Sequence, residues 1–351
     1  MTTFDDQPTT TGHQMKNILI LFSILLFSCG TEQKNEVLVS NYGYTQGTTY
    51  SIRYMSADAA DYQIAIDSVL YAVDLSMSTY MEESLISKIN RNVSMQTDSL
   101  FLRVFESAMT IANETDGAFD PTIATVVNFW GFGFEEIPNN NDDGKLKDLM
   151  LSVGYEKLSI QDSFLVKSNP NTQIDFNAIA QGFTVDLVGE HLHKLGINNY
   201  MIEIGGELKC NGLNADGELW RIGIDKPSES IQKDRFQAII EVANKSVASS
   251  GNYRKFKVDE ETGTKYAHTI NPKTGRPVQT NLLGVTIVTE SCMKADAIAT
   301  ACMVMGVDKS ILYLTDHPEI DALFIYSGPK GEWLQYQTEG FEKMSVYSSN
   351  D

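Results

Sequence analysis

The chain has 351 residues and carries 27 Lys and Arg against 46 Asp and Glu, a formal net charge of −19. A chain this acidic lacks the basic face that a general nucleic-acid partner requires, so we expect no nucleic acid among its partners. Its four cysteines show no paired spacing and no Cys/His metal spacing. Cys210, Cys292 and Cys302 therefore indicate small core residues rather than a disulfide framework or a zinc site.

The N-terminus has the pattern of a secretory signal peptide. Lys16 precedes an apolar run over 18–27, which is too short for a comfortable membrane span. The run continues into Leu26-Phe27-Ser28-Cys29, which resembles a lipobox, in which the cysteine becomes lipidated and starts the mature chain. Plain secretion with an ordinary cysteine is the alternative. Because residues 1–14 are polar, we expect Met15 to be the true start.

These features predict three segments: a signal peptide over 1–28, a lipidated N-terminus (Cys29) and linker over 29–36, and one domain over 37–351. They predict an extracytoplasmic, periplasmic protein that a lipid anchors to a bacterial membrane. In the domain, predicted helices and strands are interspersed without a βαβ rhythm, an internal repeat or a dividing linker. We therefore expect a single α+β domain of mixed sheets and helices.

The predicted elements follow from hydrophobic periodicity and from turn residues. Strands are expected from Val37 through Tyr54, and over 200–204, 219–224 and 238–242, with a closing strand-helix-strand around 312–326. Helices are expected over about 60–73, 100–115, 177–194 and 291–306. The polar stretch over 138–147 predicts an exposed loop, and 249–252 predicts a glycine-rich turn.

The helix over 291–306 carries a carboxylate and a hydroxyl within an otherwise apolar run. Asp296 and Thr300 are four residues apart, so they lie on one helical face and both oxygens can converge on one ion. Oxygen ligands alone favour a hard cation such as Mg²⁺ or Ca²⁺. The alternative is an N-capping Asp followed by a Thr bonded back to its own helix. The segment by itself leaves both readings open.

Four more polar or glycine-rich segments stand out. Asp120 precedes a proline, which also suits a local turn, and Trp130-Gly131-Phe132 suits either the core or an aromatic wall for a flat ligand. The segment over 175–182 opens a helix, where a phosphate or ion can bind, although a simple cap is as common. Gly205-Gly206 ends a strand in a tight turn or at a close approach to a ligand.

His268 is the only histidine in a motif-like context, between a segment over 249–254 and one over 267–275 that together bracket a predicted hairpin. A lone histidine is more often structural than catalytic. The residue pattern alone therefore makes His268 a candidate and no more.

Taken together, these segments resemble the ApbE family of FAD:protein FMN transferases, over about 43–306 and in the family's order. The matching pieces are Gln46-Gly47-Thr48-Thr49-Tyr50, Met77-Ser78-Thr79-Tyr80 with Ser84 and Asn90, Gly117 to Thr122, Trp130-Gly131-Phe132, Asp175 to Asp186, Gly205-Gly206, Ser250-Gly251-Asn252-Tyr253, His268 to Gly275, and Ala295-Asp296-Ala297 with Thr300-Ala301.

The resemblance implies that FAD is the substrate and Mg²⁺ the metal. It implies that the metal ligands are Asp296, Thr300 and the backbone oxygen of Ala178. Contacts to FAD would come from Gln46, Tyr80, Ala118, Phe119, Asp120, Asp175, Gln181 and Ile270. This chain departs from the commoner family pattern at two of these positions. Gln46 stands where Met is usual, and Gln181 where a charged residue is frequent.

The reaction implied is transfer of FMN from FAD to a threonine hydroxyl of an acceptor protein, with release of AMP and with His268 accepting the hydroxyl proton. The implied acceptors are subunits of sodium-translocating NADH:quinone oxidoreductases or of Rnf-type complexes. Two alternatives share the site: an FAD pyrophosphatase that gives FMN and AMP, and a non-catalytic FAD-binding lipoprotein. A general solute-binding lipoprotein would need two similar lobes and a hinge, which the sequence does not show.

Overall fold

The computed structural model describes residues 36–133, 142–227, 235–252, 256–258 and 265–349, which belong to one compact unit. The predicted signal peptide, the start at Met15 and the lipidation at Cys29 fall outside the described residues. No helix of the described part is long and apolar enough to cross a membrane.

The helices occur singly or in runs between groups of strands, and the first five follow one another directly. They are α1 (Gln63–Met77), α2 (Leu85–Asn90), α3 (Ser99–Glu114), α4 (Ala124–Phe129), α5 (Asp143–Met150), α6 (Ala180–Lys194), α7 (Cys292–Met305), α8 (Val307–Asp316) and α9 (Glu339–Met344), with a 3-10 turn at Tyr155–Lys157.

The strands form one large sheet and several small ones. They are β1 (Val37–Thr45), β2 (Thr48–Ser56), β3 (Leu158–Gln161), β4 (Phe164–Lys167), β5 (Tyr200–Ile204), β6 (Glu207–Asn211), β7 (Trp220–Asp225), β8 (Phe236–Val242), β9 (Lys245–Gly251), β10 (Phe256–Val258), β11 (Lys265–Ala267), β12 (Ile270–Asn271), β13 (Arg276–Pro277), β14 (Leu282–Thr289), β15 (Asp321–Ser327), β16 (Trp333–Gln337) and β17 (Ser345–Ser348).

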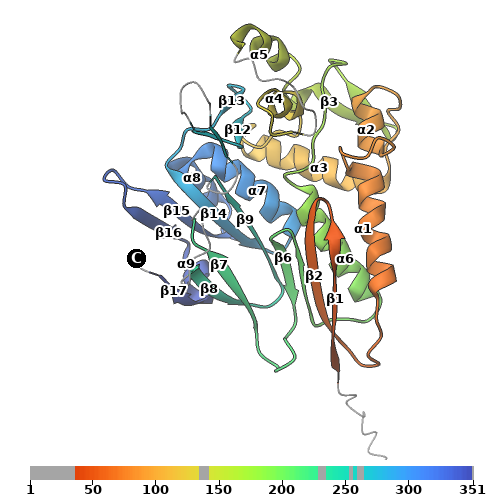
Figure 1. The fold of residues 1–351 in the computed structure, drawn as a ribbon, viewed down its shortest axis with the longest axis vertical. Coiled ribbons are helices and arrows are strands. Elements are labelled where there is room, and N and C mark those ends of the chain that lie inside the picture. The colour runs from red at the N-terminus through yellow and green to blue at the C-terminus, as the bar shows by residue number, and fades with distance from the viewer. Residues whose placement is uncertain (1–35, 134–141, 228–234, 253–255, 259–264, 350–351) are drawn as a thin grey trace, which may run out of the picture. The chain divides into compact units, whose positions relative to one another are not determined.

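The large sheet has eight antiparallel strands in the order β1-β2-β5-β6-β9-β14-β15-β16. Helices α6 and α7 pack against one face, and the small sheet β17-β8-β7 packs against the other (Figure 1). The alternation of side chains along β14 explains both layers, because Val285 and Ile287 point to the helices while Val288 points to the small sheet. The predicted α+β fold class is confirmed.

A cap residue overturns the predicted loop at 138–147. Asp142 accepts hydrogen bonds from the backbone N–H groups of Gly144 and Lys145, and it starts α5. Leu146 is buried against Trp130 and Val153. Residues 142–147 of the polar stretch therefore form the N-cap and the start of α5. The predicted loop is wrong there because the acidic residue Asp142 is a helix cap. Residues 138–141 lie outside the described part.

The glycine-rich turn predicted at 249–252 is also wrong, because β9 runs to Gly251. Ser249, Ser250 and Gly251 pair with β14, and the hydroxyl groups of Ser249 and Thr286 lie 2.8 Å apart. Pairing with β14 imposes the strand despite residues of low β propensity. The hairpin expected between 249–254 and 267–275 is present as β10 and β11.

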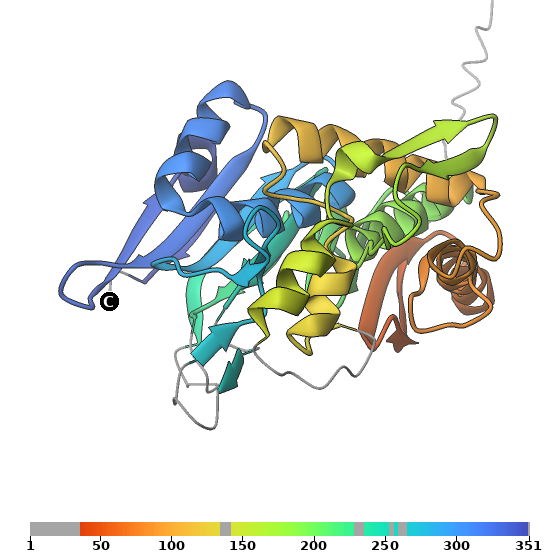
Figure 2. The same ribbon diagram turned by 90° about the horizontal axis from the view of Figure 1, so that it is seen from above.

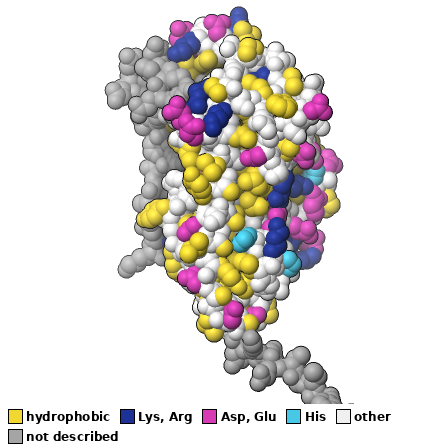
Figure 3. Space-filling view, turned by 90° about the vertical axis from the view of Figure 1, so that its right-hand side faces the viewer, with side chains coloured by type: hydrophobic (Ala, Val, Ile, Leu, Met, Phe, Trp, Pro, Cys, Tyr) yellow, Lys and Arg dark blue, Asp and Glu magenta, His cyan; other side chains and the backbone are white. Residues whose placement is uncertain are grey.

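The surface over α1 carries apolar side chains. Ile64, Tyr71 and Leu75 are exposed on the outer face of this helix, and Figure 3 shows this side of the molecule. The three cysteines predicted as core residues are buried and free, as expected.

Candidate functional site

The first turn of α6 and the second turn of α7 meet at Asp296. The carboxylate is 7% exposed, and its Oδ2 atom accepts a hydrogen bond of 3.1 Å from the backbone N–H of Gly182. Burial raises the pKa of Asp296 to about 7, although this N–H opposes the shift. The N-cap of α7 is Ser291, which accepts a hydrogen bond from the N–H of Lys294. The reading of Asp296 as an N-cap is therefore wrong.

Thr300 follows Asp296 by four residues on α7 and is half-buried. Its hydroxyl has no hydrogen-bond partner among the residues that the structure describes, so the bond back to its own helix is absent. Within the same described part, Asp296 has no Lys, Arg or His partner. A buried carboxylate without a cation beside a free hydroxyl fits a bound hard cation.

The third predicted oxygen belongs to the backbone just before α6. Ala178 is half-buried and packs against the main core immediately before the helix begins. No cluster of three or more His, Cys, Asp or Glu residues in the described part has the geometry to hold a metal. A cation here would thus depend on one carboxylate, one hydroxyl and main-chain oxygen, a set that suits Mg²⁺ and not zinc.

The tip of the β1–β2 hairpin reaches α6. Gln46 Nε2 donates a hydrogen bond of 2.7 Å to the hydroxyl of Thr184, one turn after Gln181. Three buried oxygen atoms near the predicted FAD segments have no partner in the described part: Gln46 Oε1, Thr45 Oγ1 and Thr79 Oγ1. A buried acceptor without a partner costs about 1–3 kcal/mol, so these atoms fit a site that a polar ligand completes.

Asp120 holds its own loop together. Its Oδ1 atom accepts hydrogen bonds from the N–H and the hydroxyl of Thr122, and Oδ2 accepts from the N–H of Tyr155. The turn interpretation therefore accounts for its protein contacts. The same loop joins the α6 entry, because the N–H of Asp175 donates to the carbonyl of Pro121 at 2.8 Å.

Asp175 lies just before α6 and accepts a hydrogen bond from the N–H of Asn177. Burial raises its pKa to about 6, and partial desolvation together with the Asp175 charge raises the pKa of Tyr80. The predicted residues Ala118 and Phe119 are buried in the main core beside the same loop. Gln181 lies in the first turn of α6, close to Gly205.

A second group of predicted residues surrounds β12. Ile270 is buried in a cluster with Trp130, whose indole N–H donates to the carbonyl of Gly275 at 2.7 Å. Trp130 is thus a core residue rather than a wall for a ligand. Phe132 is half-buried, and its ring lies edge-on to His268 with 6.5 Å between centroids. Figure 2 shows α4, α5 and the β12–β13 pair on the same side of the molecule.

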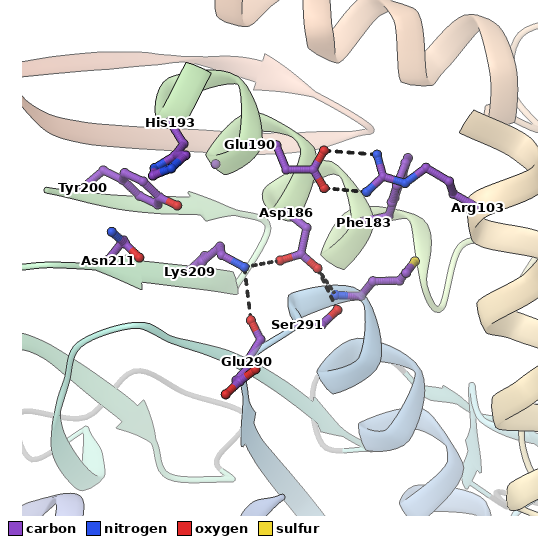
Figure 4. Close-up of a pocket in the computed structure, with 12 residues that line it drawn as sticks. Arg103, Phe183, Asp186, Glu190, His193, Tyr200, Lys209, Asn211, Glu290 and Ser291 are labelled. Atoms are coloured by element: carbon purple, nitrogen blue, oxygen red, sulfur yellow. Dashed lines mark hydrogen bonds and ion pairs between the residues drawn. The ribbon is translucent and has the colours of Figure 1, made fainter. Parts of the chain in front are cut away.

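Behind the α6–α7 contact lies a buried support that the sequence did not reveal (Figure 4). Asp186 Oδ1 pairs with Lys209 Nζ at 2.6 Å, and Oδ2 accepts from the Ser291 hydroxyl and the Met293 N–H at 2.8 and 3.0 Å. These residues line a cavity of about 450 Å³. Asp186 therefore ties the first turn of α7 to α6, one turn before Asp296.

Without a bound cation, Asp296 is expected to destabilise the fold as the pH rises from about 4 to about 7. Its pKa is about 7 in the folded protein and near 3.8 when unfolded, so the folded state binds more protons across this window. Thermal unfolding in EDTA at several pH values, compared with Asp296→Asn, isolates this contribution. The stability of the wild type relative to the variant should fall up to about pH 7 and then level off; a relative gain over that range would contradict the prediction.

Comparison with known proteins places the chain in a family. The model of the ApbE family matches residues 46–324. An FAD:protein FMN transferase of Vibrio cholerae is 37% identical over 336 residues, covering 93% of this chain and 98% of the relative, and one of Haemophilus influenzae is 35% identical, covering 84% and 87%. The chain belongs to the ApbE family, as its sequence motifs indicated.

Solved structures agree with this assignment. The flavin transferase ApbE from Vibrio cholerae matches with a TM-score of 0.80 at 36% identity, covering 88% of this chain and 99% of that one. The apo form of the Pseudomonas stutzeri flavinyl transferase ApbE matches with a TM-score of 0.78 at 29% identity, covering 90% and 98%. The fold is therefore that of the flavin transferases.

Proposed function

We propose that this FAD:protein FMN transferase depends on Mg²⁺ and attaches FMN to a threonine of an acceptor protein. The observation that carries this proposal is the buried carboxylate of Asp296, which has no cationic partner in the described part, beside the unpartnered hydroxyl of Thr300. The membership of the ApbE family and the FAD:protein FMN transferases among its relatives support the same function.

The reaction is a phosphoryl transfer at the pyrophosphate of FAD. The threonine oxygen of the acceptor bonds to the phosphorus on the FMN side, the bond from that phosphorus to the oxygen of AMP breaks, and AMP leaves. Mg²⁺ held by Asp296, Thr300 and the Ala178 backbone oxygen would supply Lewis-acid stabilisation of the phosphate charge. His268 accepts the threonine proton, because histidine is the side chain that most often acts as a general base, and this imidazole is only half-buried.

The remaining predicted residues bind and orient FAD. Gln46 is held by Thr184, and its buried amide oxygen has no other partner in the described part, so it can accept a hydrogen bond from FAD if the loop shifts on binding. Asp175 precedes α6, and its charge contributes, after burial, to the raised pKa of Tyr80. Such a reaction depends on positioning and charge neutralisation more than on covalent help from the enzyme.

The test incubates the purified protein with FAD, Mg²⁺ and the extracytoplasmic domain of an NADH:quinone oxidoreductase or Rnf-type subunit. Intact mass and in-gel flavin fluorescence follow the acceptor while AMP is assayed in parallel. We expect the acceptor mass to rise by one FMN, with one AMP released, and EDTA to stop both. Free FMN and AMP without a modified acceptor would identify a pyrophosphatase instead, and bound but unchanged FAD a storage protein.

His268→Ala is expected to slow FMN transfer by about a hundredfold or more while FAD binding changes little, because a general base contributes on this scale. Transfer rates at saturating FAD and FAD affinity by flavin fluorescence measure the two effects separately. His193→Ala, an exposed histidine on α6, is the matched control and should behave as the wild type. An equal loss of binding and rate would make His268 a binding residue.

The cellular setting is part of the proposal. We infer that the signal peptide is removed and that lipid on Cys29 holds the protein at the periplasmic face of a bacterial membrane. The acceptors are membrane-bound, so a common surface raises the effective concentration of enzyme and acceptor. Metabolic labelling with a fatty acid tests this, and a Cys29→Ser variant that still incorporates label would contradict it.

A further inference from the structure

The large sheet ends in a long edge strand. β1 is the first strand of the sheet order and pairs only with β2, over nine residues from Val37 to Thr45 (Figure 1). The hairpin closes with Gln46 at a φ of 49° and Gly47 at 73°, a two-residue turn of the type that keeps strands in tight register. The outer side of β1 therefore offers a continuous main-chain edge.

The register shows which main-chain groups face outward. The carbonyl of Thr49 accepts from the N–H of Gly205, so it points toward β5 and away from β1. Thr49 is opposite Tyr44, so this pair is not hydrogen-bonded and the N–H and C=O of Tyr44 point outward. By alternation the same holds for Tyr42, Ser40 and Leu38. None of these four residues has a main-chain partner on that side in the described part.

The composition of β1 leaves this edge unprotected. Proteins usually block a free edge with charges, proline or a bulge, and β1 has none of these over its nine residues. The side chains beside the free groups are exposed, with Tyr42 at 58% and Tyr44 at 86%. β16, at the other end of the sheet, has five residues, and its Gln335 is hydrogen-bonded to Gln237 of the small sheet.

The open edge leads directly into the proposed site. β1 ends at Thr45, and the next residue, Gln46, is hydrogen-bonded to Thr184 on α6. Water satisfies such exposed groups one by one, but only another extended polypeptide can pair with the whole row. A segment that pairs with β1 would therefore extend toward the N-terminal end of α6, where FAD is proposed to bind.

We propose that the acceptor protein docks by adding an extended segment, which leads to its target threonine, as a further strand on the outer edge of β1. This inference rests on the proposed function and names how its protein substrate is recognised. Main-chain pairing with Leu38, Ser40, Tyr42 and Tyr44 provides affinity, and the two tyrosines contact alternate side chains of the segment. The enzyme then requires an acceptor threonine in a chain segment that can extend.

Ser40→Pro tests the edge, because proline removes the outward N–H while the inward bonds of Val39 and Asn41 to β2 stay. Its matched control is Ser40→Ala, which removes the hydroxyl and keeps the N–H. The substrate is the acceptor domain that the wild type modifies, and FAD affinity and melting temperature are measured alongside transfer. For Ser40→Pro we expect kcat/KM for the acceptor to fall about tenfold or more, with FAD affinity unchanged and Ser40→Ala equal to the wild type.

Hydrogen exchange on the wild type gives a second measurement that needs no variant. Saturating acceptor should slow exchange of the Ser40 and Tyr42 amides, whereas the amides of Val39 and Asn41 are already protected by β2. Unchanged exchange at Ser40 and Tyr42, or normal transfer by Ser40→Pro, would overturn the docking proposal. A Ser40→Pro effect on self-association alone would assign the edge to a second copy of this chain. A wild type that modifies no acceptor would overturn the proposed function itself.

Discussion

Replacing Asp296 by Ala is expected to abolish FMN transfer, with a loss of about a thousandfold or more. The carboxylate is the only charged ligand in the proposed cation site, and a metal ion contributes several kcal/mol of charge stabilisation to a reaction of this kind. Transfer to the acceptor domain and AMP release measure the loss. Asp308→Ala, an acidic residue in the first turn of α8, is the control and should retain full activity.

Although Asp296→Ala should lose activity, it should not lose stability in the absence of a cation. Burial raises the pKa of Asp296 to about 7, so in the absence of a cation the charged carboxylate is a cost to the fold near neutral pH. We therefore expect the metal-free variant to melt no lower than the metal-free wild type at pH 8. Mg²⁺ should raise the melting temperature of the wild type only. If the variant retained activity, or if Mg²⁺ raised both melting temperatures equally, Asp296 would not be a ligand of the cation.

Gly182→Ala is expected to destabilise the protein by about 3 kcal/mol, the upper end for overpacking. A Cβ atom at this position would lie 2.3 Å from the Cys292 carbonyl oxygen and 2.9 Å from the Asp296 Cβ atom, so α6 and α7 would have to separate. The same shift would move the Gly182 N–H away from Asp296. Chemical denaturation measures the free energy of unfolding, and the Mg²⁺-dependent rise in melting temperature measures the site.

Gly189→Ala on the same helix is the matched control for Gly182→Ala. Its added Cβ would meet the Tyr200 hydroxyl at 2.9 Å and the Lys209 Cδ atom at 3.3 Å, which are side-chain atoms at longer distances than the backbone carbonyl that Gly182→Ala would meet. We expect a much smaller loss there. If both variants lost the same free energy of unfolding, the loss would reflect an added side chain anywhere on α6 and not the close α6–α7 contact at Gly182.

The sequence predicted the parts of this molecule that depend on local pattern. The spacing of Asp296 and Thr300 was enough to place both oxygens on one face of α7. The interspersed helix and strand patterns predicted the α+β fold class, and the segment over 175–182 predicted the entry of α6. The capping alternative could not be excluded without the structure. It fails because Ser291, five residues earlier, already satisfies the N–H of Lys294.

Contacts between segments that are distant in the chain could not be predicted from the sequence. The hydrogen bond from Gly182 to Asp296 and the one from Gln46 to Thr184 depend on how α6 crosses α7 and the β1–β2 turn. Asp186 was part of a matching motif, but its pairing with Lys209 joins segments that no local signal connects. The strand at Ser249 was missed for the same reason, because its partners on β14 override its weak propensity.

The position of the β1–β2 hairpin in the sheet bears on how the chain folds. Tyr50 of β2 pairs with Ile204 of β5, a separation of about 150 residues, and closing so long a loop costs conformational entropy before the strand contacts are gained. During synthesis the β1–β2 hairpin emerges early, and the outer edges of both strands stay unpaired until β5 has been made. The contact of Gln46 with α6 therefore forms late, and a chain that is truncated before β5 would leave the second edge of β2 unpaired.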